Sequence, residues 1–137
     1  MQSTKPIFIV ISGTGMSDAG RDIPLAMVPF YHWLLPIPHH DKKMMERALI
    51  EEVKAENEKT SAIGGFIAVR PSLLATRPPV GLAGIRVGVE KDNQVDQAAI
   101  GYTISREDVG GWIFDVLLEN EGGKRKEWMN HCVMITS

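Results

Sequence analysis

Cysteine is nearly absent from this chain, because Cys132 is the only one among its 137 residues. A single cysteine cannot form a disulfide within the chain, and zinc sites usually need a cluster of cysteine and histidine. The neighbours His39 and His40 do not supply such a cluster, since adjacent side chains point in different directions on a helix or strand. We therefore predict no internal disulfide and no metal site, and the composition favours a reducing compartment.

Long apolar runs and a strong net charge are also missing. No run is long enough to span a bilayer, and residues 1–6 are polar and lack the apolar centre of a signal peptide. The formal net charge is −2, so no strong field attracts the chain to nucleic acid or to an anionic membrane. We expect a cytoplasmic protein with no nucleic-acid partner and no membrane partner.

The residues that are present fit one globular domain over residues 1–137, with 44% hydrophobic and 23% charged residues. Residues 7–11 are five consecutive apolar residues, four of them β-branched, which is typical of a strand buried on both faces of a parallel sheet. Residues 66–69 predict a second buried strand. Shorter strands or extended segments are predicted at 85–89, 100–104 and 132–135.

Helical patterns lie between these strands. Residues 41–59 place apolar side chains every fourth position among Glu, Lys and Arg, and Asp41 is the predicted N-cap, so Lys42 falls in the first turn. Residues 25–35 predict a short or broken helix that ends at Pro36 and Pro38. Ser105 is the predicted N-cap of a last helix, whose apolar stripe is Val109, Trp112, Ile113, Val116 and Leu117. Residues 90–97 and 124–127 are predicted to be loops, with a helix stop at Gly122 and Gly123.

Ligands of open α/β sheets bind at the carboxyl ends of the strands. The first strand ends in Ser12-Gly13-Thr14-Gly15, a turn of small residues that lets backbone approach a ligand closely. The second strand ends in Arg70-Pro71-Ser72. These two turns and the helix between them define the predicted site.

Four stretches in this order resemble the C-terminal half of a short-chain dehydrogenase/reductase of the extended or atypical, NmrA-like type. Residues 7–15 are similar to the strand that delivers the active-site Ser or Thr, and residues 42–46 to the helix that carries the active-site Lys. Residues 66–72 resemble the strand and Arg-Pro turn beside the nicotinamide. Residues 104–109, followed by Trp112, resemble the late helix that packs on the sheet.

The resemblance implies an α/β fold, with a partial Rossmann-like parallel sheet and flanking helices. It also implies NAD(P) as cofactor and a small organic molecule as substrate. Catalytic roles carry over to Ser12, Thr14 and Lys42. The implied cofactor contacts are Lys42, Arg70, Pro71, Ser72 and Leu73.

Two departures separate this chain from the family pattern. The family's proton-donating Tyr lies four residues before the Lys, but counting back from Lys42 reaches Pro38, and Tyr31 lies too far back to share that helical face. His39 or His40 is a candidate acid in its place, since imidazole titrates near neutral pH. The alternative is that both histidines are loop residues at the start of the helix.

The second departure is the phosphate-binding half. Gly13-Thr14-Gly15 is the only Gly-x-Gly, and neither a third glycine nor a convincing helix follows it, so the N-terminal dinucleotide-binding half is predicted to be absent. Parallel strands without neighbours expose their edges, and we expect a homo-oligomer or a partner chain to cover them.

Three functions remain open from the sequence. The first is an NAD(P)-dependent oxidoreductase that acts on a small organic substrate. The second is a non-catalytic NmrA-like binding or regulatory module. The third is a small stand-alone domain that dimerises through residues 25–35 and binds no nucleotide.

Overall fold

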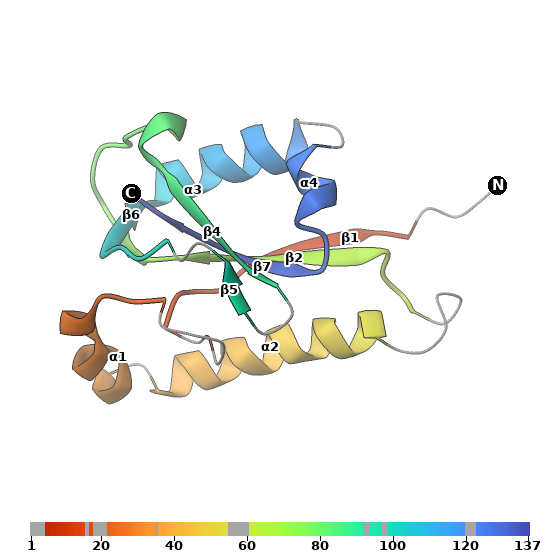
Figure 1. Ribbon diagram of the computed structural model, residues 1–137, viewed down its shortest axis with the longest axis horizontal. Coiled ribbons are helices and arrows are strands. Elements are labelled where there is room, and N and C mark those ends of the chain that lie inside the picture. Colours follow the sequence, from red (N-terminus) through yellow and green to blue (C-terminus); the bar gives the residue numbers. More distant parts are fainter. Residues whose placement is uncertain are drawn as a thin grey trace.

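The computed structural model describes residues 5–15, 17, 22–34, 36–54, 61–91, 94–96, 99–119 and 123–137. Its centre is a five-stranded sheet in the order β1-β2-β7-β4-β5, with helices on both faces (Figure 1). The first three strands of that order are parallel, β4 is antiparallel to β7, and β5 is antiparallel to β4. Their bounds are β1 Ile7–Ile11, β2 Gly65–Pro71, β4 Arg86–Lys91, β5 Gln94–Asp96 and β7 His131–Thr136.

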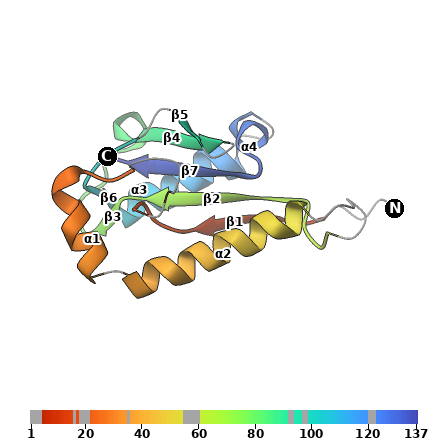
Figure 2. The ribbon, with the colours of Figure 1, turned by 60° about the horizontal axis from the view of Figure 1, so that its bottom comes forward.

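The helices form one layer on each face of this sheet. The long helix α2, Pro36–Lys54, lies on one face, and α3, Arg106–Trp112, lies on the other together with the π-helical turn η3, Ile113–Leu118 (Figures 1 and 2). A two-stranded parallel sheet pairs β3, Leu73–Ala75, with β6, Thr103–Ser105. The remaining elements are η1 Leu25–Met27, α1 Val28–Leu34, η2 Leu82–Gly84 and α4 Lys124–Glu127.

The core divides between the two faces because successive strand side chains alternate. Ile67 and Val69 point to the α3 side, where Trp112 is stacked on Trp128 with their ring centroids 5.6 Å apart. Phe66 and Ala68 point to the opposite side, against α2. The predicted stripe of the last helix is confirmed, since each of its residues belongs to the first cluster or packs against it.

The strands at 7–11 and 66–69 are confirmed, but their burial differs. Strand β2 is fully buried, whereas Ile7, Phe8 and Ile11 of β1 are 42%, 44% and 52% exposed. The prediction that β1 is buried on both faces is wrong for this structure, because β1 is the last strand on its side of the sheet among the described residues. In the part of the chain that the structure describes, β2 is the strand paired with it, on one side.

The start of α2 differs from the prediction. The predicted short or broken helix over 25–35 corresponds to η1 and α1, which ends at Leu34 before the two prolines. Pro36 and Pro38 also lie in the first turn of α2, and Asp41 lies inside that helix rather than capping it. The first-turn N–H groups of a helix have no acceptor within the helix, so proline costs little there. Lys42 is therefore in the second turn. The predicted end at residue 59 lies outside the described residues.

Two predicted loops contain regular structure. The segment predicted as a polar turn at 90–97 includes the end of β4 and all of β5, and residues 92, 93 and 97 lie outside the described part. Residues 124–127 form the short helix α4 rather than a loop. Of the predicted helix stop, Gly122 also lies outside the described residues.

The predicted N-cap Ser105 is confirmed, because its hydroxyl accepts a hydrogen bond of 2.9 Å from the backbone N–H of Asp108. The Asp108 carboxylate in turn accepts bonds from the Ser105 hydroxyl and from the backbone N–H groups of Val80 and Gly81. This carboxylate joins the helix start to the loop that precedes η2.

Candidate active site

A cavity of about 270 Å³ lies at the carboxyl ends of β1 and β2. Three parts of the chain form its wall: the turn after β1, the neighbouring parts of α1 and α2, and the segment after β2, with one side chain from α3. The residues that line it are Ser12, Gly13, Thr14, Tyr31, His39, Lys42, Pro71, Ser72, Leu73, Leu74 and Arg106.

Six of the seven residues predicted from the sequence line this cavity. They are Ser12, Thr14, Lys42, Pro71, Ser72 and Leu73. The seventh, Arg70, does not reach it. Convergence of these side chains follows from the topology, because adjacent parallel strands end at the same edge of the sheet. Their catalytic and cofactor-binding roles remain predictions.

The turn after β1 is held against the end of β2 by backbone hydrogen bonds. The N–H of Ser12 donates to the Val69 carbonyl at 2.7 Å, and the N–H of Thr14 donates to the Pro71 carbonyl at 3.1 Å. The side chains of Ser12 and Thr14 are almost fully buried, and neither hydroxyl has a hydrogen-bond partner of good geometry in the described chain. Buried hydroxyls normally have hydrogen-bond partners, so these two are among the exceptions in the described part of the chain.

Lys42 lies over this turn. Its Nζ donates to the Ser12 carbonyl at 3.4 Å, which fixes the ammonium beside the two hydroxyls. A Cβ placed on Gly13 would be only 3.3 Å from that Nζ, closer than most real contacts. The glycine in the turn therefore makes room for the lysine.

Tyr31 is a site residue that sequence reasoning missed. Its spacing from Lys42 excluded it as a residue of the same helical face, but it reaches the cavity from the separate helix α1. Its ring packs against His39, with centroids 5.3 Å apart, and against Gly15. Burial raises the pKa of the Tyr31 phenol, and the nearby Thr14 hydroxyl opposes part of that rise without the geometry of a full hydrogen bond. The prolines between residues 28 and 38 were the available signal, since they separate two helices that can fold against each other.

His39 lies in the first turn of α2, so the expectation that it is a loop residue is wrong. Burial lowers its pKa, and the positive charge of Lys42 lowers it further. Its ring packs against that of Tyr31 in the cavity wall.

Arg70 is engaged on the α2 side of the sheet. Its guanidinium donates to both carboxylate oxygens of Glu46, at 3.0 and 2.6 Å, and to Glu90 at 2.6 Å. Burial alone would lower the pKa of Arg70, but the Glu46 hydrogen bonds and the two carboxylate charges raise it above its ordinary value. Glu46 lies one helical turn after Lys42, so this buried pair docks the part of α2 that carries the lysine.

The loop after β1 joins the same network. The Ser17 hydroxyl donates to Glu90 at 2.6 Å, and the buried carboxyl of Asp22 lies close enough to Arg70 for their charges to interact. Burial is the main cause of the raised pKa of Asp22. The network therefore connects α2, β2, β4 and the loop that leads to α1.

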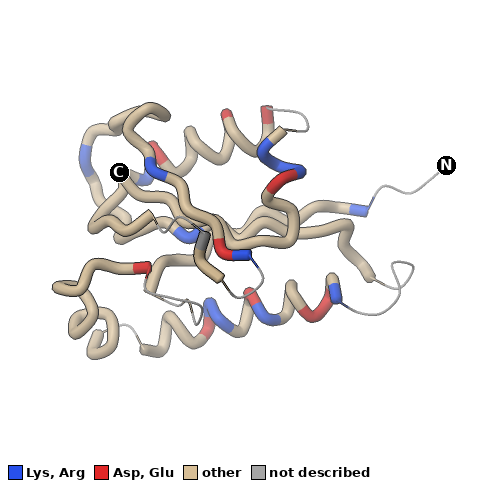
Figure 3. Tube along the Cα trace, viewed as in Figure 1, with Lys and Arg blue, Asp and Glu red and all other residues tan. Residues whose placement is uncertain are grey.

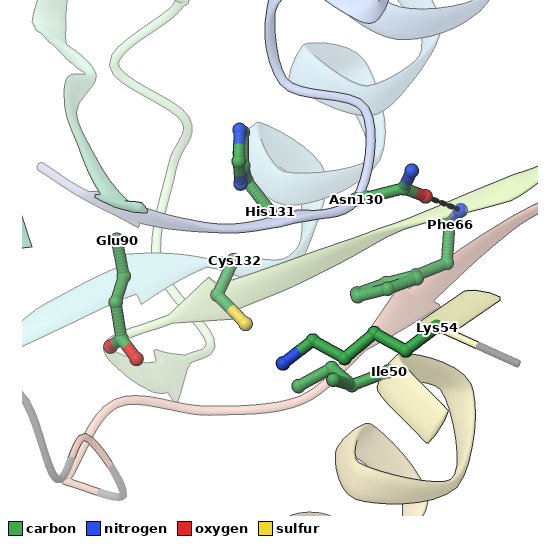
Figure 4. A pocket seen from close by; sticks show the side chains of 7 residues that line it. All are labelled: Ile50, Lys54, Phe66, Glu90, Asn130, His131 and Cys132. Atoms are coloured by element: carbon green, nitrogen blue, oxygen red, sulfur yellow. Dashed lines mark hydrogen bonds between the residues drawn. The ribbon is translucent and has the colours of Figure 1, made fainter. Parts of the chain in front are cut away.

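A second cavity, of about 450 Å³, lies between the C-terminal half of α2 and the sheet (Figure 4). Its wall includes Cys132, Phe66 and Glu90. Burial raises the pKa of the Cys132 thiol to about 12, so this thiol is not a nucleophile near neutral pH.

No group of three or more His, Cys, Asp or Glu side chains in the described ranges is arranged to hold a metal ion. Charges of both signs are spread along the described trace (Figure 3).

This chain was compared with known proteins by sequence and by fold. No family model matches the chain. Over 134 residues it is 46% identical to Reductase pytE of Aspergillus terreus. This match covers 96% of this chain and 48% of Reductase pytE. Over 140 residues it is 33% identical to Oxidase pynE of Aspergillus niger. This match covers 97% of this chain and 46% of Oxidase pynE. The chain thus spans about half the length of the curated relatives it matches.

Two crystal structures of a short-chain dehydrogenase/reductase from Veillonella parvula share the fold with a TM-score of 0.59. Their sequences are 18% and 19% identical to this chain. Each match covers 94% of this chain and 49% of the solved chain. One of the two was solved in complex with NADP. None of the helices in the described ranges has the length and apolar character needed to cross a membrane. The α/β fold predicted from the sequence is confirmed, because this chain shares the fold of about half of a short-chain dehydrogenase/reductase. The NmrA-like type stays a prediction.

Proposed function

We propose that this chain forms the lysine-bearing side of the active site of an NAD(P)-dependent oxidoreductase that acts on a small organic substrate. The observation that carries the proposal is the convergence of Lys42, Ser12 and Thr14 in one cavity at the strand ends. The two hydroxyls have no hydrogen-bond partner among the described residues. The names of the two relatives, a reductase and an oxidase, support the same class of reaction.

The residues of the cavity fit a nicotinamide cofactor. Lys42 would hold the ribose hydroxyls with its ammonium, and the side chains of Pro71, Ser72 and Leu73 would form the wall beside it. When bound, the cofactor supplies hydride transfer. Arg70 is directed at Glu46 and Glu90 instead, so we assign it to docking α2 rather than to a cofactor contact.

The hydroxyls of Ser12 and Thr14 would bind the carbonyl oxygen of the substrate. Tyr31 is the strongest candidate for the proton donor, because its phenol lines the same cavity as Lys42 and the two hydroxyls. It takes the role that the residue four positions before Lys42 has in the family pattern. At that position this chain has Pro38, which cannot donate a proton.

Strand β1 is the last strand on its side of the sheet among the described residues, so its outer edge has no paired strand there. Because this chain spans about half of its relatives, we propose that another strand covers β1, from a second copy or a partner chain. Unpaired strand edges with apolar side chains associate readily.

A non-catalytic NmrA-like module is the second candidate, and the missing tyrosine before Lys42 favours it. Titrating the purified chain with NADPH and following nicotinamide fluorescence separates the candidates. Binding followed by turnover of at least one compound in a carbonyl panel is expected for the enzyme. Binding without turnover would favour the regulatory module, and no binding at millimolar NADPH would contradict both nucleotide-binding candidates.

A further inference from the structure

We propose that the substrate of this cavity is a small carbonyl compound that carries a carboxylate and an apolar arm, and that Arg106 selects the carboxylate. The inference rests on the proposed function and names its substrate class. It depends on the charge balance of the cavity wall, on its unpartnered hydroxyls and on its exposed leucines.

The wall of the cavity is positively charged. It contains Lys42 and Arg106, and no Asp or Glu lines it among the described residues. Lys42 donates to a backbone carbonyl, and Arg106 donates through Nη1 to the Thr76 hydroxyl at 3.1 Å. Both of these acceptors are neutral, and neither cation forms an ion pair within the described ranges. A wall with two cations and no anion favours an anionic ligand.

The unpartnered hydroxyls indicate an oxygen-rich ligand as well. Ser12 and Thr14 are 3% and 2% exposed, and their hydroxyls lack partners in the described chain. The Ser72 hydroxyl, by contrast, already has a hydrogen-bond partner, the Thr136 hydroxyl at 2.8 Å. The first two hydroxyls can donate to a carbonyl oxygen, and that donation would relieve the cost of burying them unpaired.

The remaining wall is apolar. Leu73 and Leu74 are 40% and 39% exposed although they belong to the short strand β3, and the Tyr31 ring lies in the same cavity. A hydrocarbon arm packed there would remove apolar surface from water. The cavity thus has a cationic side and an apolar side, which suits an acid with a short apolar arm.

The phosphates of a nucleotide are the competing explanation for the two cations, and the experiment must separate them from a substrate carboxylate. We choose 4-methyl-2-oxopentanoate as the probe, because it combines a carbonyl, a carboxylate and a branched apolar arm. Its primary amide has nearly the same shape but no charge. Isothermal titration of the purified chain with each probe, and separately with NADPH, gives three affinities for every variant.

The acid is expected to bind about tenfold or more tightly than the amide, as one charge-assisted contact allows. Arg106→Gln should abolish that preference and leave the NADPH affinity unchanged, whereas Arg106→Lys should restore part of it. The control is Arg47→Gln, since Arg47 is exposed on α2 and lies outside the cavity wall; it should change none of the three affinities. Circular dichroism melts confirm that each variant folds.

Equal affinity for acid and amide, or no binding of the acid at millimolar concentration, would overturn the inference. A loss of NADPH affinity in Arg106→Gln would also overturn it, because Arg106 would then contact the cofactor. Binding of the acid with the predicted preference, but without any NADPH binding, would support the anion site and contradict the proposed cofactor. The two proposals can therefore fail separately.

Discussion

At the scale of single residues, four side chains lie close together at the turn after β1. Lys42, Tyr31 and the hydroxyls of Ser12 and Thr14 share one small cavity. Two glycines in the turn leave room for the lysine and the tyrosine.

Replacing Lys42 by Ala should lower NADPH affinity at least about tenfold, because one charge-assisted hydrogen bond to the ribose is lost. The free energy of unfolding should change by less than about 0.5 kcal/mol, since Lys42 is not buried in the core. Fluorescence titration and urea unfolding measure the two effects. Lys54→Ala, on the exposed end of the same helix, is the control and should leave both unchanged. Parallel losses of binding and stability would mean that Lys42 is a structural residue.

Replacing Gly15 by Ala should destabilise the fold by about 1–3 kcal/mol, because a non-glycine residue is strained at this backbone conformation. Its φ is 87°, and an added Cβ would lie 2.5 Å from Cδ1 of Tyr31. Gly110→Ala is the matched control, since that helical glycine has open space around it and the change should stabilise α3 by up to about 1 kcal/mol. Chemical denaturation of both variants tests the geometry of the turn. Equal stability of the two would show that the Tyr31 ring does not lie against Gly15.

At the scale of elements, the parts with strong local signals were predictable. The apolar runs marked β1, β2 and β7, and Ser105 with its apolar stripe marked the start and face of α3. The start of α2 was misjudged because two prolines in a first turn look like a helix end. Arg70 was assigned to the ligand because the sequence does not show which side chains it will meet across the sheet. Its two glutamate partners are 24 and 20 residues away, in α2 and β4.

The start of α3 gives a prediction about pH. The pKa of Asp108 is lowered, since burial, which would raise it, is outweighed by hydrogen bonds from Val80, Ser105 and Gly81. A carboxyl with a depressed pKa stabilises the fold fully above its unfolded pKa, and that stability is lost as the pH falls through its folded pKa. Asp108→Asn should therefore destabilise the protein at neutral pH, and the difference from the parent should shrink below about pH 3.8, the ordinary value. Urea unfolding over this pH range measures it. A constant difference across the range would contradict the assigned hydrogen bonds.

At the scale of the whole molecule, β1 is the last strand on its side of the sheet among the described residues. Phe8→Lys should block association through this edge, because charged side chains prevent pairing of strand edges. The fold should stay intact, since Phe8 is 44% exposed. Sedimentation velocity of the parent and the variant tests this expectation. Trp33→Glu, in the 83% exposed position on α1, is the comparison. Dissociation by Trp33→Glu alone would instead support a dimer built on residues 25–35.

The central claim is that Lys42 and the two buried hydroxyls face a nicotinamide cofactor. A crystal structure of this chain grown with NADP tests it most directly. We predict electron density for the nicotinamide ribose within hydrogen-bond distance of Lys42 Nζ, beside Pro71 and Leu73. Nucleotide bound in the cavity at Cys132 instead, or no nucleotide at saturating concentration, would contradict the account.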